Sequence, residues 1–145
     1  MAKLTHAASF RDLVVYQKAK AVSHAIFEAS KSFPRDETYS LTDQMRRASR
    51  SIGAQIAEAW AKRRYERHFI SKLSDADAEQ METQHWFSEA RDCHYMDPQK
   101  AKNLLMELEE IGRMLNSMME KSHLFCDQSP DLIREAAEGY IVEKG

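Results

Sequence analysis

The clearest fold signal in the chain is residues 41–59, LTDQMRRASRSIGAQIAEA. Its apolar side chains recur every three or four positions, so they fall on one face of an α-helix that we expect to continue to about Arg64. A stripe of this kind is stable in water when another helix covers it, so the segment predicts a helical bundle. The predicted core positions are Leu41, Met45, Ala48, Ile52, Ile56 and Ala59.

Three other segments carry the same spacing and predict helices over about residues 9–33, 66–94 and 97–124. Ile70 and Trp86 lie off the stripe of residues 66–94, which predicts a second buried face there, in a wide core or against another subunit. The predicted core positions of the three helices are Val15, Ala19, Val22, Ile26, Ala29 and Phe33; Phe69, Leu73, Ala76, Gln80, Thr83, Phe87 and Ala90; and Leu104, Leu108, Ile111, Leu115 and Met118.

Capping residues predict where the helices begin. Pro34 ends the first helix, and Ser129-Pro130 predicts one more short helix up to Glu138. At each of three predicted helix starts, a side chain can accept a hydrogen bond from free backbone amides, and an acid or a proline follows in the first turn. They are Ser9 with Asp12, Ser40 with Asp43, and Asp97 with Pro98.

The connections between the predicted helices are short, which favours antiparallel neighbours. We therefore expect an all-α fold, an antiparallel up-down-up-down four-helix bundle with a short C-terminal helical tail. Residues 1–8 are expected to be a flexible N-terminus, residues 9–125 the bundle, and residues 126–145 the tail.

The composition is that of a single globular domain, with 145 residues, 43% hydrophobic and 30% charged. A net charge of −2 gives no overall attraction to nucleic acid, so any such binding needs a local patch. Cys93 and Cys126 lack the spacing of a metal site. The sequence carries neither a signal-peptide pattern nor an apolar run that could cross a membrane, so we expect a cytoplasmic protein without membrane contact.

Basic residues are concentrated around the second predicted helix. They form a candidate nucleic-acid site, although a basic run on one helix is more often a solubilising face. In a ring-shaped oligomer such residues would repeat around an axis and concentrate positive potential. The candidates are Arg46, Arg47, Arg50, Lys62, Arg63, Arg64 and Arg67.

A polar stripe follows the same helix beside its apolar face and is a candidate oligomer interface. In that hypothesis Arg47 pairs with a carboxylate, and Glu58 is held by donors from a facing helix. The alternative is simple exposure to solvent. The stripe comprises Gln44, Arg47, Ser51, Gln55 and Glu58.

Two Glu-x-x-His motifs, at Glu82–His85 and Glu120–His123, resemble the ligand sets of di-iron bundles, with Glu28 and Glu58 on the other helices. In an antiparallel hairpin the two motifs lie about 10 Å or more apart along the bundle axis, too far for one cluster. No nucleophile elbow or phosphate loop is present. We therefore expect a protein that is not an enzyme and has no cofactor or metal. Four aromatic residues could serve as base-stacking platforms, although completing the core is the favoured role: Trp60, Tyr65, Trp86 and Tyr95.

Several short motifs resemble the bacterial four-helix-bundle family that includes proteins encoded in intervening sequences of 23S ribosomal RNA genes. Gln55 and Ala59 depart from that pattern, where the family often has Asn and Gly, and the Gly-Ser often seen in its third helix is absent from residues 75–79. The motifs are Phe10-Arg-Asp-Leu13-Val-Val-Tyr16-Gln17, Phe33-Pro34, Tyr39-Ser-Leu41-Thr-Asp-Gln44-Met-Arg-Arg47-Ala48, Ser51-Ile52, Ile56-Ala57-Glu58 and Glu82-Thr83-Gln84.

The resemblance implies a homopentameric ring and kinship with accessory proteins of diversity-generating retroelements, which bind reverse transcriptase and nucleic acid through a basic surface. It implies no enzyme activity. Three hypotheses follow: an oligomeric scaffold that binds RNA, DNA or a protein partner such as a reverse transcriptase; a protein-only interaction module; and a metal-dependent enzyme that uses the Glu-x-x-His motifs.

Overall fold

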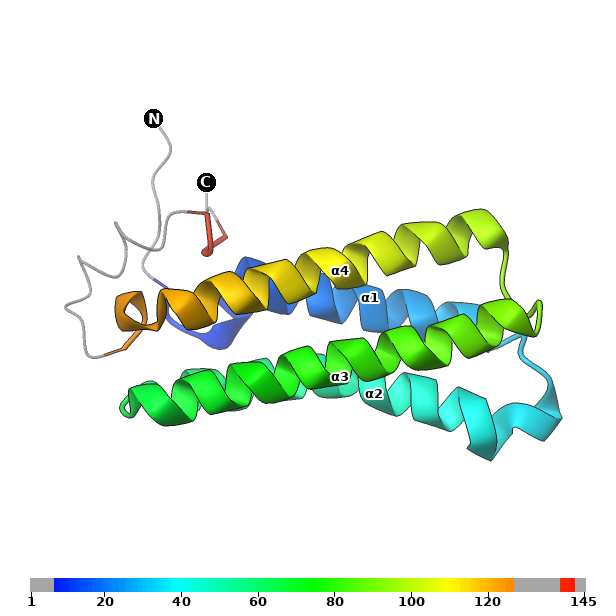
Figure 1. Ribbon diagram of the computed structural model, residues 1–145, viewed down its shortest axis with the longest axis horizontal. Coiled ribbons are helices and arrows are strands. Elements are labelled where there is room, and N and C mark those ends of the chain that lie inside the picture. Colours follow the sequence, from blue (N-terminus) through cyan, green and yellow to red (C-terminus); the bar gives the residue numbers. More distant parts are fainter. Residues whose placement is uncertain (1–6, 127–138, 143–145) are drawn as a thin grey trace.

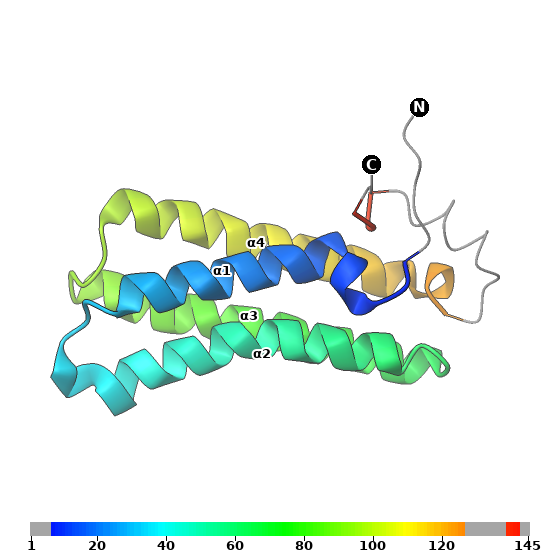
Figure 2. The same ribbon diagram turned by 180° about the vertical axis from the view of Figure 1, so that it is seen from behind.

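The structure, a computed structural model, describes residues 7–126 and 139–142. These residues form an all-α fold in which consecutive long helices run antiparallel (Figure 1). Each long helix packs against its neighbour in sequence, and α1 also contacts α4, so the four surround one core (Figure 2). The four helices are α1 (Val14–Ser30), α2 (Asp43–Ala61), α3 (Glu66–Asp92) and α4 (Pro98–Glu120).

The core confirms the predicted spacing. Every predicted core position of α2, α3 and α4 is buried, and in α1 all are buried except the half-buried Ala29. The polar core positions of α3 are satisfied within the helix itself. Thr83 donates to the carbonyl of Glu79 at 2.8 Å, and Gln80 donates to Asp77 at 2.9 Å. These bonds explain how a stripe with two polar members still packs inside a bundle.

Two of the three predicted caps are present. Ser9 and Asp12 form a reciprocal capping box, although it opens a 3-10 turn, Phe10–Asp12, before α1 begins. Asp97 accepts from the amide of Lys100 at 3.0 Å, with Pro98 in the first turn of α4. Both caps hold backbone amides that no helical carbonyl reaches.

The cap predicted at Ser40 is wrong. Ser40 lies inside a π-helical turn, Thr38–Thr42, and its hydroxyl donates to the carboxylate of Glu37 at 2.7 Å. This turn runs directly into α2, so the residue before α2, Thr42, is already helical and makes no side-chain cap. A capping residue needs extended backbone, which a continuous helical path does not provide.

All four helices end before the residue predicted for them, and α4 ends at Glu120 rather than near Leu124. α1 ends at Ser30 rather than Phe33, and α2 ends at Ala61 rather than Arg64. α3 ends at Asp92, two residues before His94, whose φ of 61° is left-handed and incompatible with a continuing helix.

The far end of the chain returns to the start of α1. The amide of Val14 donates to the carbonyl of Tyr140 at 2.9 Å, and that of Val142 donates to the carbonyl of Asp12 at 2.8 Å. The Tyr140 ring packs edge-on against Phe125. The helix predicted after Ser129-Pro130 lies outside the described residues. Within the described part of the chain, no helix is long and apolar enough to cross a membrane.

Candidate nucleic-acid interface

The basic residues singled out from the sequence separate into two groups in the structure. One group, which we call the arginine triad, lies in the first half of α2 and comprises Arg46, Arg47 and Arg50. The other surrounds the turn between α2 and α3 and comprises Lys62, Arg63, Arg64 and Arg67. At 1.5 Å per residue, Arg46 and Lys62 are about 24 Å apart along the helix axis. They therefore do not form one continuous patch.

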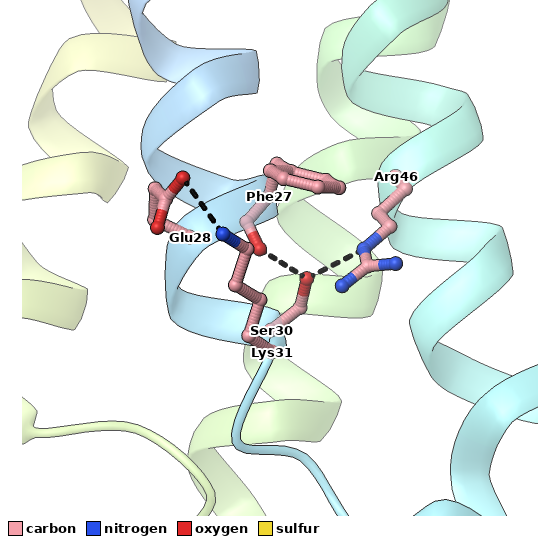
Figure 3. Close-up of polar contacts among 5 residues, drawn as sticks. All are labelled: Phe27, Glu28, Ser30, Lys31 and Arg46. Atoms are coloured by element: carbon pink, nitrogen blue, oxygen red, sulfur yellow. Dashed lines mark hydrogen bonds and ion pairs between the residues drawn. The ribbon is translucent and has the colours of Figure 1, made fainter.

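The arginine triad surrounds a hollow of about 430 Å3 on the outer face of α2. Two of its guanidinium groups pack over the ring of Phe27 in α1, Arg46 at 4.6 Å and Arg50 at 5.2 Å from the ring centre. Nε of Arg46 also donates to Oγ of Ser30 at 2.7 Å (Figure 3). These contacts hold two long side chains in place across the α1–α2 boundary.

The triad carries little compensating negative charge. Among the residues that the structure describes, none of its arginines forms an ion pair. Glu28 lies near Phe27 but pairs with Lys31 at 3.2 Å, and Lys31 also lies over the Phe27 ring at 4.9 Å. The carboxylate that lines the triad's hollow is Asp43. Three cations thus converge on one aromatic ring within a chain of net charge −2.

In the second basic group, Arg63 is held by contacts with its own helix end. Its guanidinium stacks on Trp60 at 3.5 Å, and its Nε donates to the carbonyl of Trp60 at 2.9 Å. Burial lowers the pKa of Arg63, and the nearby Cys126 opposes that shift. The side chains of Lys62, Arg64 and Arg67 are exposed.

A groove of about 700 Å3 runs between α1 and α2 beside the triad. Sequence reasoning missed it, because the aromatic candidates were sought at helix ends. A second stripe on the first helix, at positions 16, 20, 23 and 27, would have indicated this face. The groove is lined by Phe10, Tyr16, Ala19, Lys20, Ser23, His24, Phe27, Glu28, Arg50, Gly53, Ala54 and Ala57.

The polar stripe runs along the side of α2 toward α3, and two of its members, Arg47 and Ser51, also line the triad's hollow. Glu58 pairs with Lys72 of α3 at 3.8 Å, and Ser51 donates to the carbonyl of Arg47 at 2.8 Å. The structure brings no carboxylate into an ion pair with Arg47. Oε1 of Gln55 is buried and has no hydrogen-bond partner among the described residues. Gln44 is half-buried at the start of this stripe.

The remaining sequence candidates lie elsewhere. In both Glu-x-x-His motifs the glutamate and the histidine are exposed, and the described residues contain no group of three or more side chains that could hold a metal ion. Trp60, Trp86 and Tyr95 are half-buried against the core, whereas Tyr65 is 58% exposed. On the acidic face of α3, burial raises the pKa of Glu79, with smaller contributions from Glu82 and Asp75.

Comparison with known proteins finds a matching family and a crystal structure of similar fold. A family model described as "23S rRNA-intervening sequence protein" matches residues 11–117. The crystal structure of a protein of unknown function from the S23 ribosomal protein family of Bacteroides thetaiotaomicron VPI-5482 is similar in fold, with a TM-score of 0.65 and 25% sequence identity. The similarity covers 73% of this chain and 98% of that one. Among curated proteins, no sequence matches.

Proposed function

The chain belongs to the 23S rRNA-intervening sequence protein family, and from that premise we propose that it is a non-enzymatic homo-oligomeric scaffold that binds nucleic acid through the arginine triad. The proposal makes RNA or DNA the ligand and the outer face of α2 the contact surface. The fold supplies the rigid support, and the family provides no catalytic precedent.

The observation that carries the proposal is the charge of Arg46 and Arg50, which are held in place by contacts and form no ion pair among the described residues. Arg46 and Arg50 are one helical turn apart, and like charges at that spacing destabilise a helix by about 0.2–0.5 kcal/mol. Their contacts with Phe27 and Ser30 hold them together despite this repulsion. A phosphate would relieve the repulsion and could accept paired hydrogen bonds from the planar guanidinium groups. Ordering the side chains beforehand reduces the entropy lost on binding.

The oligomeric part of the proposal rests on the polar stripe. A buried acceptor without a partner, such as Oε1 of Gln55, destabilises a protein by about 1–3 kcal/mol. If the Gln55 side chain turned outward, a donor from a second copy could reach this oxygen and remove that penalty. A pentameric ring is the assembly that the family resemblance implies, and it would repeat the triad around one axis and strengthen the positive potential.

The experiment is an anisotropy titration with RNA and with DNA at several salt concentrations. The test variant changes all three triad arginines to Gln, and the control changes three exposed cations away from the triad, Lys100, Lys102 and Arg113. Both variants remove the same charge. We expect only the triad variant to lose affinity. For a single strand, the slope of the logarithm of the binding constant against the logarithm of the salt concentration should be smaller by about 2.

Two results would overturn the nucleic-acid part of the proposal. One is an absence of binding to either nucleic acid at low salt, which would favour the protein-only interaction module. The other is an equal loss of affinity in both variants, because general charge rather than the triad would then explain the binding. Sedimentation at several protein concentrations tests the oligomeric part separately.

A further inference from the structure

The groove between α1 and α2 has a shape that a phosphate contact alone does not require. Its wall on the α2 side consists of Gly53, Ala54 and Ala57, whose small side chains leave it open. The facing wall carries the half-buried rings of Phe10 and Tyr16. Packing does not demand a glycine here, because an added Cβ at Gly53 would lie 3.4 Å from Tyr16, at ordinary contact distance. The groove therefore has apolar walls, and the Tyr16 ring closes it at Gly53.

The rim of the same groove is basic. Lys20, His24 and Arg50 line it, and the one carboxylate among its lining residues, Glu28, already pairs with Lys31. Its volume of about 700 Å3 lies within the range of about 300–1,000 Å3 typical of small-molecule pockets. An apolar floor under a cationic rim is complementary to a nucleotide, which presents an aromatic base beside an anionic phosphate.

Phe27 joins the groove to the arginine triad. Its ring lines the groove and also supports the guanidinium groups of Arg46 and Arg50. A phosphate bound at those arginines would place the base of the same or the next nucleotide at the mouth of the groove. In a duplex that base is paired and stacked, so it cannot enter without being unstacked.

We propose that this groove accepts an unstacked base of a single-stranded nucleic acid whose phosphates contact Arg46 and Arg50. The inference rests on the proposed function and makes it specific: the protein distinguishes single strands from duplexes. The aromatic and small residues of the groove determine this preference, whereas the arginines contribute to the binding of both forms.

The test compares a single-stranded oligonucleotide with a hairpin duplex of equal phosphate number, at one low salt concentration. Two variants fill the groove, Ala54→Leu and Ala57→Leu, and Ala78→Leu on the exposed face of α3 is the matched control. We expect the unaltered protein to prefer the single strand by at least tenfold. Each filling variant should lose most of that preference, and the control should keep it. Circular dichroism checks that the variants remain helical.

A second measurement does not depend on mutation. Ultraviolet crosslinking of the single strand, followed by peptide mapping, should place the crosslinks at Phe10, Tyr16 or Phe27. Crosslinks confined to other peptides would overturn the inference.

The outcomes separate the inference from the proposed function. Equal affinity for both forms, with the triad still required, would overturn the inference and leave the proposed function standing. Loss of all binding at low salt would remove both. A filling variant that changes the sedimentation mass but keeps the strand preference would assign the groove to contact with a second copy, and the inference would be wrong.

Discussion

Two glycines lie in the middle of helices, and replacing them with alanine should change the free energy of unfolding in opposite directions. Replacing a helical Gly with Ala gains about 1 kcal/mol of helix propensity when there is room for the methyl group. At Gly53 there is room, because the nearest atom to an added Cβ is Tyr16 Cε1 at 3.4 Å. We therefore expect Gly53→Ala to raise the free energy of unfolding by about 0.5–1 kcal/mol.

At Gly112 of α4 the methyl group would collide with α3. An added Cβ would lie 2.7 Å from Nε2 of Gln80 and 3.3 Å from Oδ1 of Asp77. Nε2 of Gln80 is also the atom that donates to Asp77, so moving it breaks a buried hydrogen bond. Overpacking costs about 1–3 kcal/mol and the lost bond a similar amount, against a gain of about 1. The net prediction for Gly112→Ala is a loss of about 1–5 kcal/mol.

Urea denaturation followed by circular dichroism measures both changes at a single protein concentration, which matters if the chain is an oligomer. Shortening the obstructing side chain gives the control: Gln80→Ala should remove much of the penalty of Gly112→Ala, and a double-mutant cycle measures that coupling. If Gly112→Ala and Gly53→Ala raise the midpoint alike, the close approach of α3 and α4 at Gln80 is refuted.

Three further predictions concern the two edges of α2 and the hydrogen bond of the half-buried Tyr95. Glu58→Ala should lower oligomer stability in sedimentation more than the exposed Glu107→Ala, and equal effects would remove Glu58 from the interface. Ser30→Ala removes the acceptor that fixes Arg46 and leaves the charge unchanged. The affinity for nucleic acid should therefore fall a few-fold while its dependence on salt stays the same, and a changed salt dependence would contradict this. A hydrogen bond to Glu37 raises the pKa of Tyr95 to about 12 from 10.0, so the unfolded state loses its proton first. The urea midpoint should therefore fall between pH 10 and 12 in the unaltered protein but not in Tyr95→Phe.

The fold could be predicted because core positions recur every three or four residues along each helix, and this spacing stays visible even where a core residue is polar. Gln80 and Thr83 show this: both are polar, both fall at predicted core positions, and both are buried with their bonds made inside α3. Helix ends were harder, because they depend on backbone conformation. Nothing in the amino-acid sequence around Ser40 distinguishes a capping residue from one inside a π-helical turn.

The candidate site was only partly predictable. A count of charges along the chain treats residues 46 to 64 as one basic run, whereas the helix separates Arg46 from Lys62 by about 24 Å. The contacts of Phe27 with Arg46 and Arg50 join different helices, and no periodicity within one segment reveals such a pair. The tight approach at Gly112 likewise depends on where Gln80 of the neighbouring helix lies.

The two proposed surfaces of α2 share Arg47 and Ser51 at the triad's hollow but separate at the groove. Arg46, Arg50 and Ala57 face α1, where Phe27 and the groove lie, while Gln55 and Glu58 follow the edge toward α3. Successive residues rotate by about 100° around a helix, so Gln55 lies about 140° or more from these three residues, whereas Glu58 lies about 80° from Arg50. An assembly built on the α3 edge would therefore leave the groove open in every copy. It follows that filling the groove should reduce single-strand binding without changing the sedimentation mass, and that disrupting the stripe should do the reverse.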